Sequence, residues 1–272
     1  KIAEARPDVD VISLERMLPD KEGMANPLSS LPHHDSPNLS LAVDLDGGFD
    51  ELLARSSGKR KRKKHRSQTR KFETAGSFRR IEARTPDETR RLLDAFFAMK
   101  QFPFQQLGIA NDFAERGVRE FFQALFAGAL KDQRPEFVLH GLEVAGTLRA
   151  VTGCSRSGNR IICEFGAIAE DDLAHTSPGD FLFFCNIEEA CAEGLAVYDY
   201  SVGDEPYKRL WCDLETRHFD VVVPLSAKGR LLSLLMRHYA AFKSWMKSSP
   251  LVWNLTKALR RKTAGQPQPA DD

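Results

Sequence analysis

The sequence predicts an α/β domain built on a mixed, mostly antiparallel sheet with helices on both of its faces. Three observations favour this fold class. Segments of strand-like and helical periodicity alternate between residues 77 and 226. Three consecutive strands are joined by tight turns, which makes them antiparallel neighbours. A helix expected over residues 180–193 connects two further strands, and a helical crossover joins parallel strands.

The composition is typical of a globular protein with one large or two smaller domains. The chain has 272 residues, of which 42% are hydrophobic and 28% charged, and this excludes wholesale disorder and a small disulfide scaffold. No apolar run reaches the ~18–20 residues that cross a bilayer. The five cysteines form no Cys-x-x-Cys pair, which favours a reducing, cytoplasmic location. Because the chain opens at Lys1, we interpret it as the C-terminal piece of a longer protein.

Residues 1–47 contain two expected strands, Val9–Leu14 and Leu39–Leu45, with turn-rich sequence between them. A similar order of strand, turn, strand and basic helix recurs over residues 195–262. We therefore expect residues 1–47 to be the remnant of a preceding copy of the domain.

A basic helix is expected next, over residues 48–76. Its middle, Lys59–Lys71, carries nine positive charges and no acidic residue. Since the net charge of the chain is +1, the remainder carries −8. The lack of an apolar stripe predicts an exposed linker helix. Its packing contacts are expected to be limited to Phe49, Leu52, Leu53 and Phe72.

The main domain is expected over residues 77–226 and begins with a short strand at 78–83. Thr85 and Glu88 then form the capping box of a helix. A helix and three strands follow, at 117–130, 136–144, 146–153 and 160–168. After the helix at 180–193, Gly194 is placed to end it, and the remaining elements are a strand at 195–202, a helix at 205–212 and a strand at 219–224. A C-terminal helix is expected over 227–262, followed by a disordered tail over 263–272.

Two stretches of this domain resemble a known family. Ser177-Pro178-Gly179 opens a helix, and Gly203–Arg209 followed by Trp211 forms a Tyr-Lys-x-x-Trp segment. Together with the order of elements, they resemble the acyl-CoA N-acyltransferase (GNAT) fold. Within it, they are similar to the cellulose-biosynthesis-associated (CelD/BcsL) acetyltransferases. The resemblance implies an acyl-CoA-dependent N- or O-acyltransferase that acts on a small-molecule or glycan acceptor in polysaccharide or cell-envelope synthesis.

The resemblance also implies where acetyl-CoA binds. A helix start presents free N–H groups that suit a phosphate. The expected cofactor contacts are therefore those at this helix start, the backbone at the end of the preceding strand, and a lysine of the Tyr-Lys segment: Ser177, Pro178, Gly179, Asp180, Ala167, Ile168, Ala169 and Lys208. The alternative to acetyl-CoA binding is that Ser177-Pro178-Gly179 is an ordinary proline-containing helix start with a structural role alone.

Three residues are candidates for proton transfer. Tyr207 has a phenol that suits protonation of a leaving thiolate. Glu164, between Cys163 and Phe165, and Asp199 on the next strand are alternative bases. Each also has a structural alternative, as a packed tyrosine, an exposed strand residue and a hydrogen-bonding partner respectively.

Two other functions stay open at this point. The basic run Lys59–Lys71 could bind tRNA, and the Fem-type aminoacyl transferases, which this family resembles, use such a donor. The run lacks the aromatic residues that single-strand binding would also use. The absence of the usual GNAT phosphate-binding loop also fits a non-catalytic scaffold of a polysaccharide synthase. His33-His34-Asp35 is expected to lie in a turn without further ligands, so no metal is expected.

Overall fold

The computed structural model describes residues 2–21, 23–107 and 111–248, and these fall into two compact units. The larger unit contains residues 42–201 and 205–214. The smaller one contains the described residues up to 41, residues 202–204 and those from 215 onward. The C-terminal tail expected over 263–272 lies outside the described residues.

The larger unit is built on a sheet with the strand order β4-β9-β8-β7-β6-β5. Of β4 it holds the last residues, from Ala42. All the strand pairs from β5 to β8 are antiparallel, whereas β8 and β9 are parallel. The strands are β4 (His33–Asp44), β5 (Phe78–Glu82), β6 (Phe137–Val144), β7 (Thr147–Ser157), β8 (Arg160–Ile168) and β9 (Val197–Val202).

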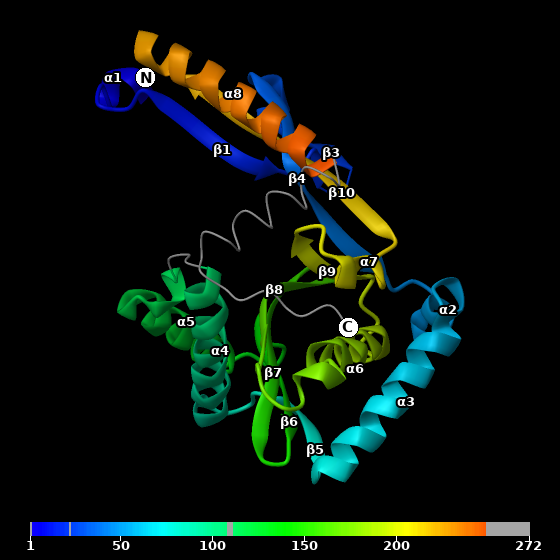
Figure 1. The fold of residues 1–272 in the computed structure, drawn as a ribbon. Coiled ribbons are helices and arrows are strands. Elements are labelled where there is room, and N and C mark those ends of the chain that lie inside the picture. The colour runs from blue at the N-terminus through cyan, green and yellow to red at the C-terminus, as the bar shows by residue number, and fades with distance from the viewer. Residues whose placement is uncertain (1, 22, 108–110, 249–272) are drawn as a thin grey trace. The chain divides into compact units, whose positions relative to one another are not determined.

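Helices cover both faces of this sheet (Figure 1). Helices α4 and α5 pack on one face through a core rich in phenylalanine. The second face is covered by α6, with α2 and α3 beside it. The helices are α2 (Gly48–Arg55), α3 (Gly58–Ala75), α4 (Pro86–Leu107), α5 (Arg116–Ala129), α6 (Pro178–Ala192) and the short α7 (Pro206–Arg209). This architecture confirms the predicted fold class.

The capping signals act as the sequence predicts. Thr85 Oγ1 accepts the N–H of Glu88, and a carboxylate oxygen of Glu88 accepts the N–H of Thr85 in return. At the other end of the domain, Gly194 follows α6 with a φ of 71° and donates its N–H to the carbonyl of Cys191. A side chain at that φ would be strained, which explains the glycine.

The basic helix differs from the expectation. It is two helices, and they meet where Ser57 takes a φ of 54° and Gly58 lies so close to α2 that a Cβ there would come within 2.3 Å of the Leu53 carbonyl oxygen. Its packing is also wider than expected. His65 stacks on Phe181 and Phe184 of α6, and Gln68 is buried. Helix α3 therefore belongs to the larger unit and is not an exposed linker helix.

Helix α3 packs without an apolar stripe because its polar and charged side chains make the contacts with the neighbouring aromatic rings. The imidazole of His65 stacks like an aromatic ring, and Lys61 places its ammonium over the ring of Trp211, 4.5 Å from its centre. Leu52, Leu53 and Phe72 are buried as predicted, and Phe49 packs edge-on against Phe184.

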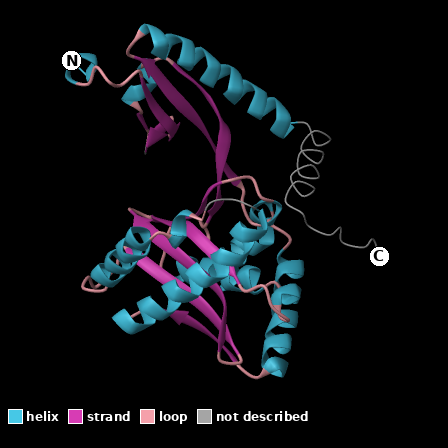
Figure 2. Cartoon of the chain, turned by 60° about the vertical axis from the view of Figure 1, so that its left-hand side comes forward, coloured by secondary structure: helices cyan, strands magenta, loops and turns pink. Residues whose placement is uncertain are grey.

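The smaller unit has the strand order β1-β10-β4, with β1 (Val11–Met17) antiparallel to β10 (Leu214–Pro224). A hairpin of β2 (Asp20–Lys21) and β3 (Met24–Ala25) and the short α1 (Ile2–Ala5) complete its N-terminal part. The long helix α8 (Ala227–Ser248) runs along its strands (Figure 2). His33-His34-Asp35 begins β4 and does not lie in a turn.

Among the described residues, no helix is both long enough and apolar enough to span a bilayer.

Candidate active site

Strands β8 and β9 separate partway along their length. Their parallel pairing runs from Arg160 opposite Val197 to Ile162 opposite Asp199. Strand β8 then continues to Ile168 and β9 to Val202 without further pairing between them. The sheet is therefore open between the carboxyl ends of these two strands, the end at which α/β sheets usually bind ligands.

A β-bulge lies just after the point where the pairing ends. Cys154 on β7 pairs with Cys163, and Gly153 pairs with Phe165, so Glu164 is the extra residue. The bulge turns Phe165 to the α4 and α5 face, where its ring covers Gly153. A Cβ on Gly153 would lie 2.1 Å from that ring. Such a bulge bends the strand and re-aims its side chains.

The free backbone donors of the opening follow from the strand pattern. Ala169 donates its N–H to the carbonyl of Arg149, 2.9 Å away, which directs that group toward β7. Successive residues of a strand direct their N–H groups to opposite edges. Gly166 and Ile168 therefore direct theirs toward the opening, and Ala167 toward β7. Of Ala167, Ile168 and Ala169, the strand-end residues expected to contact acetyl-CoA, only Ile168 directs its N–H toward the opening.

The N-terminus of α6 lies at the same end of β8. A Cβ on Gly179 would come within 2.9 Å of Cγ2 of Ile168, so the helix start and the strand end are in close contact. Pro178 has no N–H, and the N–H groups of Asp180 and Phe181 bond to the carbonyl of Ser177. The N–H of Gly179 has no partner within the part of the chain that the structure describes.

The loop before α6 is held by the basic helix. The buried amide of Gln68 donates to the carbonyls of Thr176 and Ser177, at 2.8 and 3.0 Å. Ser177 itself has a φ of 57°, and its side chain does not cap the helix as its position predicts. Sequence reasoning missed Gln68, because one polar residue in a basic run gives no periodic signal.

Asp180 is a less favourable neighbour for a phosphate than the sequence suggests. Its carboxylate is bonded to the ammonium of Lys64 at 2.9 Å and to the indole nitrogen of Trp211 at 3.4 Å. These contacts fasten α3 and the segment after α7 to the start of α6. The ammonium of Lys64 offsets the negative charge beside Gly179, and we assign Asp180 a positioning role.

Tyr207 lies in the first turn of α7, as predicted. Its ring stacks on Phe183 of α6 at 6.0 Å and meets Tyr200 of β9 at 6.3 Å. Phe183 is one helical turn from Gly179, and Tyr200 follows the last paired residue of β9. Tyr207 is thus placed beside the opening and is 46% exposed. Partial burial raises the pKa of its phenol above the ordinary value, so the hydroxyl keeps its proton at neutral pH.

Lys208 differs from the expectation of a phosphate-binding side chain at the surface. It is buried, and its ammonium lies 2.9 Å from a carboxylate oxygen of Glu205. The short helix α7 exposes Tyr207 and directs the next residue inward. The structure thus gives Lys208 an internal ion pair.

The two candidate bases are placed very differently. Asp199 is buried and accepts hydrogen bonds from Arg160 at 2.6 Å and from the backbone of Ser201 at 2.7 Å. It holds the turn that ends β9, where Ser201 has a φ of 60°. Glu164 is exposed, and among the described residues its carboxylate accepts a hydrogen bond from Ser155 Oγ at 2.5 Å. The apolar surroundings expected for Glu164 are absent, since its side chain is exposed.

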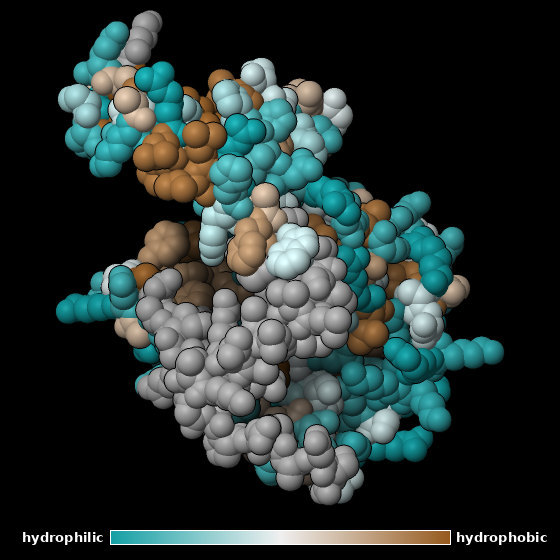
Figure 3. Space-filling model, turned by 45° about the horizontal axis from the view of Figure 1, so that its top comes forward, coloured by the Kyte–Doolittle hydropathy of each residue, from teal (hydrophilic) through white to brown (hydrophobic). Residues whose placement is uncertain are grey.

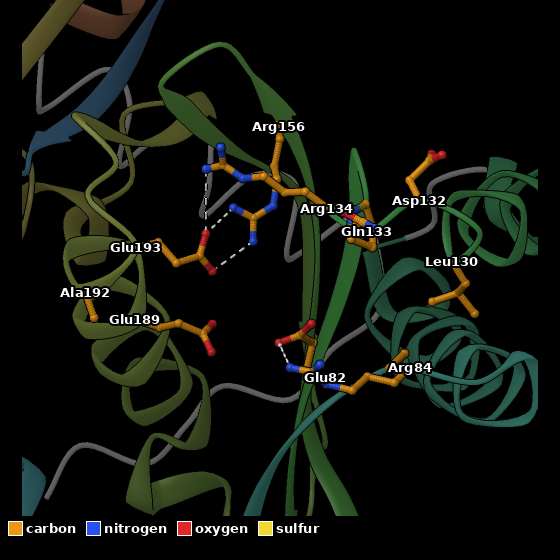
Figure 4. Close-up of a pocket in the computed structure, with 12 residues that line it drawn as sticks. Glu82, Arg84, Leu130, Asp132, Gln133, Arg134, Arg156, Glu189, Ala192 and Glu193 are labelled. Atoms are coloured by element: carbon orange, nitrogen blue, oxygen red, sulfur yellow. Dashed lines mark hydrogen bonds and ion pairs between the residues drawn. The ribbon is translucent and has the colours of Figure 1, made fainter.

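A separate pocket of about 620 Å³ lies at the opposite end of β8, where α6 ends (Figure 4). Arg156 pairs with Glu193, which lowers the pKa of that carboxyl, and Arg134 also points to Glu193. Glu82 and Glu189 face each other across it. With the buried His140 they could surround a cation, their ligand atoms lying within 4.8 Å of one another.

The guanidinium of Arg80 weakens the case for a cation there. It forms a two-pronged ion pair with Glu189 through Nη1 and Nη2, and Arg84 lies 3.4 Å from Glu82. Both carboxylates are thus already neutralised by arginine. Burial, with Arg80 and Arg156 nearby, also lowers the pKa of His140. The pocket is best described as an ion-pair network between β5, β7 and α6.

Comparisons with solved structures agree with this fold. FemX superposes with a TM-score of 0.51 at 10% identity, over 85% of this chain and 69% of that one. The C-terminal domain (DUF2156) of a putative lysylphosphatidylglycerol synthetase from Agrobacterium fabrum gives 0.52 at 11% identity, over 86% and 73%. At such identities the likeness shows the fold alone. No curated protein matches the sequence.

A sequence-family model matches more specifically. The model described as acetyltransferase (GNAT) domain matches residues 59–209, which is more than half of the chain. The matched segment runs from the basic helix α3 to the last residue of α7 and so includes the opening between β8 and β9. The chain therefore belongs to the acetyltransferase (GNAT) domain family.

Proposed function

We propose that the chain transfers an acyl group from acyl-coenzyme A to an amine or hydroxyl of a small-molecule or glycan acceptor. The observation that carries the proposal is the open end of β8 and β9 beside the start of α6. There the N–H of Gly179, unpartnered among the described residues, lies beside Ile168, and strand alternation directs the N–H groups of Gly166 and Ile168 toward the opening. The family match supports acyl transfer in general.

Acyl-coenzyme A would supply a thioester, whose carbonyl carbon is open to attack. Gly179 would hold a phosphate through its N–H, since a helix N-terminus favours an anion. The N–H groups of Gly166 and Ile168 would hold and orient the carbonyl oxygen. Lys64 forms an ion pair with Asp180, and its positive charge offsets the repulsion between the Asp180 carboxylate and a bound phosphate.

Two side chains would move the protons. The exposed carboxylate of Glu164 takes the proton from the attacking amine or hydroxyl as the new bond to the acyl carbon forms. The hydroxyl of Tyr207 gives its proton to the sulfur as the old bond breaks. Asp199 is better explained as the anchor of Arg160 and Ser201 than as a base.

The acceptor class rests on the resemblance of the Ser-Pro-Gly and Tyr-Lys-x-x-Trp segments to the cellulose-biosynthesis acetyltransferases. Polysaccharide or cell-envelope synthesis is therefore the proposed context. A cytoplasmic location fits the five free cysteines, since thiols are kept reduced there.

A second donor, aminoacyl-tRNA, is favoured by one specific observation on α3. Four exposed basic side chains lie opposite its packed face, at Lys59, Lys63, Arg66 and Arg70. They recur at helical spacing and form one stripe, which suits the phosphates of a nucleic acid. The solved structures with the same fold include FemX and the putative lysylphosphatidylglycerol synthetase domain.

Two titrations on the same protein separate the donors. Calorimetry with acetyl-CoA should give saturable heat, and a gel shift with bulk tRNA should give no shift at moderate salt. A tRNA shift that disappears when Lys59, Lys63, Arg66 and Arg70 become glutamine, together with no heat from acetyl-CoA, would favour the second donor. Neither signal would favour a scaffold without catalytic activity.

A further inference from the structure

We infer that the outer face of α8 is a docking surface for an anionic lipid bilayer, on which the helix lies parallel to the membrane plane. The surface is defined by five large apolar side chains: Leu231, Leu234, Leu235, Phe242 and Trp245. Each is more than half exposed, from 52% at Leu234 to 63% at Leu231. The inference is independent of the acyl donor proposed above.

The inner face of α8 is already used by the smaller unit. Gly229, Ser233, Met236 and Ala240 recur at helical spacing and are buried or half-buried, whereas the other α8 side chains that the structure describes are exposed. The helix lies so close to the start of β1 that a Cβ on Gly229 would come within 1.9 Å of the Asp10 carbonyl oxygen. Small residues thus make the contact with the protein. This reverses the usual pattern, in which the large apolar residues face the core.

The five large residues lie on the side of the helix opposite that contact. At about 100° per residue, Leu231, Leu235 and Phe242 are roughly half a turn away from Gly229 and Ala240. Phe242 and Trp245 also touch each other, with ring centres 5.9 Å apart. Figure 3 shows apolar side chains gathered on the surface of the smaller unit, at the top of the view. Exposed large apolar side chains gathered on one face of a helix mark an interaction surface.

The charge around this face identifies the partner. Helix α8 contains five lysines and arginines and no aspartate or glutamate. Arg230 and Arg237 are exposed along one flank of the face, and Lys228 lies at its start on the other flank, where it also reaches Asp10 at 3.0 Å. An apolar face bordered by basic residues, with tryptophan and phenylalanine toward one end, is the pattern of a helix that lies in the interface of an anionic membrane.

A second copy of the chain fits this face less well. Two such helices packed face to face would bring their arginine and lysine flanks together with no acidic residue on either helix to pair them. A nucleic acid would use the charges but would leave the leucines in water.

Vesicle flotation tests the inference directly. The full chain should float with vesicles of phosphatidylcholine mixed with phosphatidylglycerol, and far less with phosphatidylcholine alone. The double variant Leu235→Gln and Phe242→Gln should lose at least about tenfold in apparent affinity, because two exposed side chains no longer enter the bilayer. Arg230→Gln with Arg237→Gln should lose the preference for phosphatidylglycerol and its sensitivity to salt.

Controls separate this result from misfolding and from the proposed catalysis. Phe121→Gln, which removes a 60% exposed phenylalanine on α5 of the larger unit, should float like the wild type. Circular dichroism of the α8 variants should be unchanged. In acetyl-CoA calorimetry the α8 variants should give the same result as the wild type, whether that result is binding or no binding. Flotation of the double variant equal to that of the wild type would overturn the inference. The inference would also be overturned if the wild-type chain did not float with vesicles and sedimented as a dimer while the double variant sedimented as a monomer.

Discussion

Gly179 and Ile168 are in such close contact that a single methyl group on the glycine would come within 2.9 Å of Cγ2 of the isoleucine. This contact joins the first turn of α6 to the last residue of β8. It places an unpartnered N–H next to a strand end whose own N–H faces the opening toward β9. The candidate site depends on this proximity more than on any single side chain.

Replacing Tyr207 with phenylalanine should lower kcat by the ~10²–10⁴ typical of general acid–base catalysis while donor binding changes little. Only the hydroxyl is removed, so the stacking on Phe183 is retained. Steady-state kinetics with the acceptor measures this. Tyr239→Phe, at an exposed tyrosine of α8, is the matched control. Unaltered turnover of Tyr207→Phe would make Tyr207 a packing residue.

The two carboxylates should respond differently to neutralisation. Glu164→Gln should lower turnover, with little loss of stability because Glu164 is exposed. Asp199→Asn should cost about 1–3 kcal/mol of stability, since it weakens a buried bond to Arg160. Urea unfolding and kinetics on both variants distinguish them. A stable but inactive Asp199→Asn would exchange the two roles.

Gln68 should matter for both stability and donor binding. Gln68→Leu leaves the carbonyls of Thr176 and Ser177 without their donor, which should cost about 1–3 kcal/mol and loosen the start of α6. Thermal unfolding and acetyl-CoA calorimetry measure the two effects. The neighbouring exposed Ser67→Ala should change neither. Wild-type stability of Gln68→Leu would contradict the assigned role of α3.

His65 should make stability depend on pH near neutrality. Burial against Phe181 and Phe184 lowers the pKa of this imidazole below its ordinary value. Its unfolded form therefore binds a proton first as the pH falls, so the stabilisation is present above the unfolded pKa of about 6.5 and is lost below it.

Urea unfolding at pH 7.5 and 5.5 should then show a loss that His65→Phe reduces by on the order of 1 kcal/mol or less. His238→Gln, at an exposed position of α8, should leave the loss unchanged. The same pH dependence in His65→Phe and the wild type would refute this assignment.

The sequence predicts the fold well where one signal repeats along an element. Leu92, Phe96 and Phe97 at helical spacing, the Thr85–Glu88 capping box and the crossover helix between β8 and β9 all reappear in the structure. These features are local, or they follow from a general rule of sheet topology.

The features of the site that the sequence does not predict depend on tertiary contacts. The bulge at Glu164 cannot be predicted from the sequence, because one extra residue in a strand does not change the composition of that strand. The burial of Lys208 depends on Glu205 beside it. The packing of α3 depends on His65 and Gln68, which do not count as apolar in a hydrophobic pattern.

The most direct measurement is calorimetry of acetyl-CoA with Gly179→Ala beside Gly128→Ala. Both replace a helical glycine, but a Cβ on Gly128 meets nothing within 4 Å, whereas one on Gly179 presses on Ile168. The account predicts that Gly128→Ala binds acetyl-CoA like the wild type, and that Gly179→Ala binds at least about tenfold more weakly at unchanged thermal stability. Equal acetyl-CoA affinity of the two variants, or no binding by the wild type, would contradict the claim that acyl-coenzyme A is held where α6 meets β8.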